Sequence, residues 1–100
     1  MSENPLARIG QLDPDLTKLV QQMNAFALTD GALPRKFKLL IAMALDAAHG
    51  AVQGVRSLAL QAKAAGATKE EIMEAIRVAC YVNGGSCVYT AANAFREIEL

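Results

Sequence analysis

The chain has 100 residues, of which 53% are hydrophobic and 20% charged, and its ten basic residues balance its ten acidic ones. A chain of this length forms one domain and buries only about 60–70% of its unfolded surface. The surplus of apolar residues therefore predicts a surface that another subunit covers. Zero net charge provides neither an electrostatic footprint for nucleic acid nor a polybasic membrane patch, and we expect neither partner.

No apolar run reaches the roughly 18 residues that a membrane-spanning helix needs. The first residues also lack the apolar core of a signal peptide, so we expect a cytoplasmic protein. The two cysteines, Cys80 and Cys87, are too few for a disulfide framework, and their spacing is not that of a zinc site.

Residues 1–12 contain a proline, a glycine and scattered polar side chains, and we expect a flexible N-terminal arm before a helical domain over residues 13–100. Asp13-Pro14 provides a helix cap and a first-turn proline. The helix that follows ends at Thr29-Asp30-Gly31, and its apolar residues have amphipathic spacing: Leu16, Leu19, Val20, Met23 and Phe26.

The next helix opens at Pro34, and Gly50 is placed to end it in a left-handed cap. Residues 39–45 include no polar side chain, so this helix must be buried on every side. One chain of 100 residues cannot easily cover it. The run therefore predicts an obligate oligomer.

Three more helices complete the chain. Residues 51–65 form one that Gly66 closes, Thr68-Lys69-Glu70-Glu71 is a capping box for the next, and Ser86 caps the last after the Asn83-Gly84-Gly85 turn. The fourth helix is expected to bury Ile72, Ala75, Ile76, Ala79 and Cys80, and the fifth Val88, Ala91, Ala92 and Phe95. Without any β pattern, the fold is predicted to be all-α, a single small domain of about five helices.

The run LPRKFKLLIAMAL, a glycine-bounded segment and then AAGATKEEIMEAIRVACYVNGG follow in an order that resembles the carboxymuconolactone decarboxylase family, which includes the alkyl hydroperoxidase D-like proteins. The resemblance spans roughly residues 33–95. It implies an alkyl hydroperoxidase D-like helical unit that assembles into a homotrimer or homohexamer. In the peroxidase branch it also implies a thiol site: a glutamate, eleven residues, CxxC, three residues and a histidine.

The positions that match this pattern hold Leu39 for the glutamate, Ala51 and Gly54 for the cysteines, and Leu58 for the histidine. Such a site needs a thiolate of lowered pKa, a resolving thiol and a carboxylate–histidine relay, which these side chains cannot supply. Decarboxylase members carry histidines near the start of the third helix, where this chain has Gln53 and Leu58. Neither activity transfers residue by residue.

Asp46 and His49 are the best candidates for catalysis, because they lie three residues apart on one helix face. The carboxylate could orient and charge the imidazole, the side chain best suited to proton transfer near neutral pH. Gln53 would share their face if the helix continued. Alternatively, His49 only hydrogen-bonds the last turn of its helix. One histidine and one aspartate are too few for zinc, and we expect no metal and no cofactor.

Three functions remain open. The first is a cofactor-free acid–base enzyme, or a binder, for a small carbonyl or carboxylate compound, with Arg56, Tyr81 and Tyr89 as candidate substrate-binding residues. The second is a thiol-dependent peroxidase, an antioxidant activity as in the alkyl hydroperoxidase D branch, with Cys80 and Cys87 as alternative thiols; a buried Cys80 would instead act as a small hydrophobe. The third is a non-catalytic oligomeric module.

Overall fold

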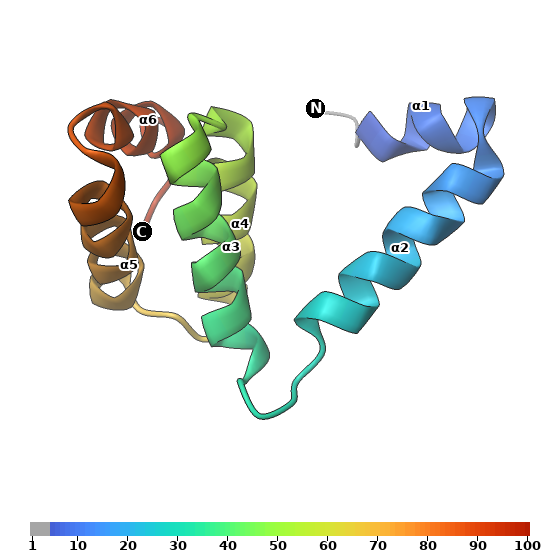
Figure 1. Ribbon diagram of the computed structural model, residues 1–100, viewed down its shortest axis with the longest axis horizontal. Coiled ribbons are helices and arrows are strands. Elements are labelled where there is room, and N and C mark those ends of the chain that lie inside the picture. Colours follow the sequence, from blue (N-terminus) through green and yellow to red (C-terminus); the bar gives the residue numbers. More distant parts are fainter. Residues whose placement is uncertain (1–4) are drawn as a thin grey trace.

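The structure is a computed structural model that describes residues 5–100, and over that range it consists of six α-helices without a strand (Figure 1). In chain order these are α1 (Pro5–Leu12), α2 (Pro14–Leu28), α3 (Arg35–His49), α4 (Val52–Ala64), α5 (Lys69–Asn83) and α6 (Ser86–Ala94). The predicted all-α class is confirmed. The helix beyond the predicted five is α1, which occupies most of the region expected as a flexible arm; residues 1–4 lie outside the described range.

Helices α3 to α6 pack into a bundle, the body of the molecule, and α3 is its central element because it contacts α4, α5 and α6. The core is built from aliphatic side chains, many of them alanine, so the helices approach closely. Its largest fully buried side chains are Leu39, Met43, Val55, Ile72 and Cys87. In the described part of the chain, no helix is long and apolar enough to cross a membrane.

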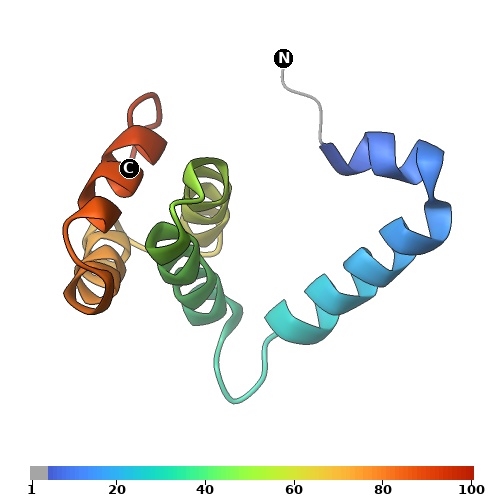
Figure 2. The ribbon, with the colours of Figure 1, turned by 45° about the horizontal axis from the view of Figure 1, so that its top comes forward.

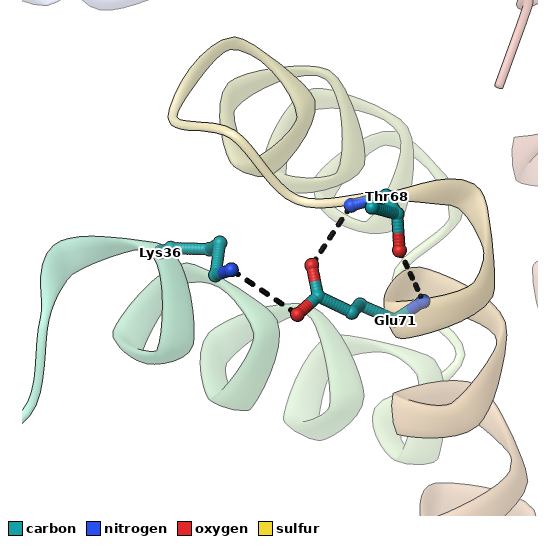
Figure 3. A network of polar contacts seen from close by, with 3 residues as sticks. All are labelled: Lys36, Thr68 and Glu71. Atoms are coloured by element: carbon teal, nitrogen blue, oxygen red, sulfur yellow. Dashed lines mark hydrogen bonds and ion pairs between the residues drawn. The ribbon is translucent and has the colours of Figure 1, made fainter.

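The predicted capping box at the start of α5 is confirmed, and it is also a contact between helices (Figure 3). The Thr68 hydroxyl accepts a hydrogen bond from the Glu71 N–H at 3.0 Å, and the Thr68 N–H donates to Glu71 Oε1 at 2.9 Å. The other carboxylate oxygen of Glu71 lies 3.1 Å from Lys36 Nζ. The first turns of α3 and α5 are thereby tied together.

Other predicted boundaries agree with the structure, but the prediction for α6 does not. Gly50 ends α3 with φ of 77°, a left-handed conformation that glycine adopts without a Cβ penalty. Ser86 is not the cap of α6: the N-cap is Gly85, and the Ser86 hydroxyl instead accepts a hydrogen bond from the Asn83 amide at 3.4 Å.

The inward face of α6 is rotated relative to the prediction. It consists of Cys87, Ala91 and Ala94, whereas Val88 and Ala92 are exposed. The helix begins directly after the Gly84-Gly85 turn with no side-chain cap, so the turn, rather than a polar signal at Ser86, sets the phase of its buried face. On α5, the prediction of the buried face is correct for Ile72, Ile76 and Ala79, whereas Ala75 and Cys80 are partly exposed.

Helices α1 and α2 form an arm that stands away from the body in both views (Figures 1 and 2). Helix α1 contacts α2 and no other helix of the described chain, and α2 contacts the body only through α3. The N-cap is as predicted, since the Asp13 side chain accepts from the Leu16 N–H at 3.1 Å. Yet neither helix buries a residue, and Phe26 is 85% exposed.

The apolar run on α3 is covered on one side only. Leu39, Leu40 and Met43 are buried in the core, whereas Ile41 is 50% and Leu45 58% exposed. Within one chain, therefore, the run is not buried on every side as its composition requires.

Candidate functional site

The candidate site lies at the corner where α3 ends at His49 and α4 begins at Val52. Asp46, one turn before the end of α3, is half-buried, and Gly54 faces it from the first turn of α4. A Cβ atom at position 54 would lie 2.8 Å from Asp46 Cγ and closer still to Oδ2. The carboxylate of Asp46 therefore occupies the space that a side chain at position 54 would take, and any residue other than glycine there would require the Asp46 side chain to move.

The carboxylate of Asp46 is free to bind a ligand or accept a proton. It takes no part in the hydrogen bonds and the ion pair formed among residues 5–100. The N-cap of α4 is Ala51, which supplies no side-chain acceptor. In the first turn the Val52 N–H donates to the Gly50 carbonyl at 3.1 Å, whereas the Gln53 and Gly54 N–H groups have no partner among residues 5–100. The positive end of a helix favours an anion, so the corner places a free carboxylate beside unsatisfied donors.

His49 is not paired with Asp46, contrary to the predicted relay. The Lys36–Glu71 pair is the only salt bridge within residues 5–100. The physical reason is that the Asp46 side chain packs against Gly54 of α4, whereas His49, the last residue of α3, remains exposed. The two groups share a corner without a hydrogen bond or ion pair between them, and a substrate would have to bridge them.

Gln53 and Arg56 form a structural contact between α4 and α6. Arg56 donates from Nε to the Ala94 carbonyl at 2.9 Å, from Nη2 to the Asn93 carbonyl at 3.1 Å, and from Nη1 to Gln53 Oε1 at 3.0 Å. A cation is favoured where the last carbonyls of a helix lack partners. The guanidinium that we predicted to bind substrate is thus occupied by the end of α6 in this structure.

The two tyrosines lie on the outer surface of the body. Tyr81 on α5 is 90% exposed, and Tyr89 on α6 is exposed as well. An open hollow of about 520 Å³ lies at the opposite end of α3 from Asp46, beside Arg35, Lys36 and Gly66. Neither tyrosine lines it.

Cys80 and Cys87 are free thiols on α5 and α6. Cys87 is fully buried, whereas Cys80, which was expected on the buried stripe of its helix, is partly exposed and packs against the edge of the core. Burial, and then a hydrogen bond with the Cys80 side chain, raise the pKa of Cys87 to about 11. At neutral pH this thiol is therefore almost entirely protonated.

Two contributors to the corner were not among the predicted site residues. Gly54 entered the sequence analysis only as the residue at the position of a cysteine of the peroxidase branch, and the structure places the Asp46 side chain against it. Thr90 on α6 lies near the cap of α3, with its hydroxyl 4.0 Å from where a Cβ on Gly50 would be, and donates to the Ser86 carbonyl at 3.2 Å. Within residues 5–100, no three His, Cys, Asp or Glu side chains are grouped to hold a metal ion.

The sequence and the fold were compared with those of known proteins. The chain is similar to the crystal structure of a carboxymuconolactone decarboxylase family protein from Legionella pneumophila in its apo form, with 33% identity over 91% of this chain and 81% of that one and a TM-score of 0.85. No match to a curated protein was found. The sequence model of the Carboxymuconolactone decarboxylase family matches residues 14–97, from the first residue of α2 to just beyond α6. This chain therefore belongs to the carboxymuconolactone decarboxylase family.

Proposed function

We propose that this protein is a cofactor-free acid–base catalyst, or a binding protein, for a small carbonyl or carboxylate compound, with Asp46 as the proton-accepting group. The observation that supports it is the carboxylate of Asp46 in the space of a side chain at position 54. In the resemblance to the peroxidase branch, position 54 aligns with the second thiol of the CxxC. A carboxylate there replaces redox chemistry with proton transfer.

The proposed reaction needs only groups at the corner. The ionised carboxylate of Asp46 takes a proton from a carbon next to a carbonyl, the C–H electron pair moves into an enolate, and the proton returns to the product. The free N–H groups at the start of α4 stabilise the negative charge on the enolate oxygen. His49 at the exposed rim binds a substrate carboxylate when its imidazole is protonated.

Carboxymuconolactone, the compound in the family's name, is a suitable probe because it carries both a lactone carbonyl and a carboxylate. In D₂O, we expect the wild-type protein to exchange or transform the probe, followed by proton NMR, and the probe to shift amide resonances of residues 46–56. Asp46→Asn should lower the rate about 10²- to 10⁴-fold, the usual contribution of a positioned acid–base group. His49→Gln should weaken binding of the probe.

Asp15→Asn is the matched control, since it makes the same chemical change on the exposed arm. It should leave rate and binding unchanged. A wild-type protein that neither binds nor turns over the probe would contradict the assignment to carbonyl and carboxylate compounds. Equal rates in Asp46→Asn and Asp15→Asn would remove Asp46 from the reaction.

The peroxidase alternative receives less support. A peroxidatic cysteine reacts as the thiolate and is activated by a lowered pKa, whereas the pKa of Cys87 is raised. We expect little reduction of an organic hydroperoxide with a dithiol donor. Robust turnover that disappears in Cys80→Ser would favour the thiol function instead.

A non-catalytic role in a homotrimer or homohexamer is the remaining candidate, and the exposed apolar side chains of the arm and of α3 favour assembly. Assembly and catalysis are compatible, so the Asp46→Asn experiment decides whether the assembled protein also has chemistry at the corner. An oligomer with no ligand effect at the corner would be a module without chemistry.

A further inference from the structure

The open hollow at the start of α3 combines features of a small-molecule site. It lies where the loop before α3 meets the connection between α4 and α5, at the lower end of the body in Figure 1. Its volume of about 520 Å³ is in the range of ligand-binding sites. Arg35, which begins α3 here, is roughly 16 Å along the helix from Asp46, so the hollow is separate from the corner.

The hollow has an apolar side, to which Pro34, Phe37 and Ala65 contribute. Phe37 is 42% exposed, and its ring centroid lies 5.0 Å from Lys36 Nζ. The ion pair with Glu71 holds that ammonium group from the other direction, so ring and lysine form a fixed wall (Figure 3). The apolar side therefore offers a surface on which the hydrocarbon part of a ligand can pack.

Of the charged side chains that line the hollow, one is unpaired. The Asp30 carboxylate accepts a hydrogen bond from the Arg35 N–H at 2.5 Å, and Lys36 is paired with Glu71. The guanidinium of Arg35, in contrast, takes no part in the hydrogen bonds and the ion pair formed among residues 5–100. Because the guanidinium presents a planar fork of N–H donors, it matches the two oxygens of a carboxylate.

We propose that the hollow binds a small monocarboxylate with an apolar body, its carboxylate on the Arg35 guanidinium and its body against Pro34 and Phe37. A single unpaired cation balances one negative charge. A phosphate dianion would bring a second charge toward the Asp30 carboxylate without a partner for it, and like charges repel. The proposal is independent of any chemistry at Asp46.

Titration of the full chain with benzoate, followed by NMR, tests the site. Benzoate should shift the amide resonances of residues 30–37 and 65–67 and the Nε–H resonance of Arg35. Arg35→Gln should weaken binding at least about tenfold, because it removes a charge-assisted pair of hydrogen bonds. Arg77→Gln is the matched control, since Arg77 is an exposed arginine on α5 away from the hollow, and it should leave binding unchanged. Circular dichroism should show that both variants retain the wild-type helicity.

Two further probes and two further variants define the ligand class and the place of binding. Benzamide, which keeps the ring but not the charge, and inorganic phosphate should both bind more weakly than benzoate. Ala65→Leu should weaken benzoate binding by filling part of the hollow while Arg35 stays in place. His49→Gln, at the corner, should leave the shifts of residues 30–37 unchanged. Shifts confined to residues 46–56, equal losses in Arg35→Gln and Arg77→Gln, or tighter binding of benzamide or phosphate than of benzoate would each overturn the proposal.

Discussion

Helices α5 and α2 form an instructive pair, because they share length and local signals but differ in environment. Each has 15 residues, and each begins with a side-chain N-cap, Thr68 for α5 and Asp13 for α2. Helix α5 buries Ile72, Ile76 and Ala79, whereas α2 buries nothing. Caps and periodicity thus determine that a helix forms and where it begins. They do not say whether its apolar face is covered by the same chain or by another.

The largest difference between the two helices should appear when a side chain on each apolar face is truncated. Ile72→Ala leaves a cavity in the core and should lower the free energy of unfolding by about 2–5 kcal/mol. Leu19→Ala, measured in the dissociated protein, should change it by less than about 0.5 kcal/mol, as expected of an exposed site. Urea denaturation gives both values. Equal losses would mean that the arm folds against its own body.

The helix boundaries were predictable because each is encoded locally. The Asp13 cap, the left-handed Gly50 and the capping box at Thr68 each act within one turn of the chain, and all three are confirmed. The phase of α6 was not predictable in this way, since the Gly84-Gly85 turn sets it without a side-chain cap. Helix α1 was missed because a proline and a glycine in eight residues suggest an irregular segment.

In the candidate site, too, local features were predictable from the sequence and tertiary contacts were not. The sequence singled out Asp46, but it paired this residue with His49 because the two are neighbours on one helix. The contact that the structure shows is with Gly54, eight residues later on another helix, and it depends on how α3 and α4 pack. A glycine that makes room for a side chain from another element has no local signature. Likewise, the carbonyl partners of Arg56 on α6 come from tertiary packing.

A double-mutant cycle at the corner would measure the contact between Asp46 and Gly54. Gly54→Ala adds a methyl group that displaces the carboxylate, although alanine is favoured over glycine within a helix by about 1 kcal/mol. In an Asp46→Ala background the conflict disappears, because the nearest remaining atom, Cβ of residue 46, is 3.5 Å away. Gly54→Ala should then be stabilising. We expect a coupling of about 1–3 kcal/mol from urea denaturation, and additive effects would contradict the geometry.

The two N-caps offer a smaller, matched test of body against arm. Thr68→Ala removes the acceptor for the Glu71 N–H and should lower the free energy of unfolding by about 1 kcal/mol. Asp13→Ala removes the equivalent acceptor for the Leu16 N–H. In the dissociated protein it should reduce the helicity of α2 but leave the unfolding midpoint of the body unchanged. A shift of that midpoint as large as the one in Thr68→Ala would show that arm and body unfold as one unit.

The smallest expected effect is the response of the Glu71 contact to acid, which again concerns the body alone. The hydrogen bond from the Thr68 backbone N–H, and then the contact with Lys36, hold the pKa of Glu71 below its ordinary value of 4.5 (Figure 3). A carboxyl group with a lowered pKa in the folded state stabilises the fold fully above its unfolded pKa, and this contribution is lost as the pH falls through the folded value. Wild type should therefore exceed Glu71→Gln in unfolding midpoint at neutral pH, and the difference should shrink below pH 4.5. Glu70→Gln, in the same turn but without these two bonds, is the control. A difference between wild type and Glu71→Gln that stays constant down to the acid limit would mean that the charge of Glu71 contributes nothing to the joint between α3 and α5.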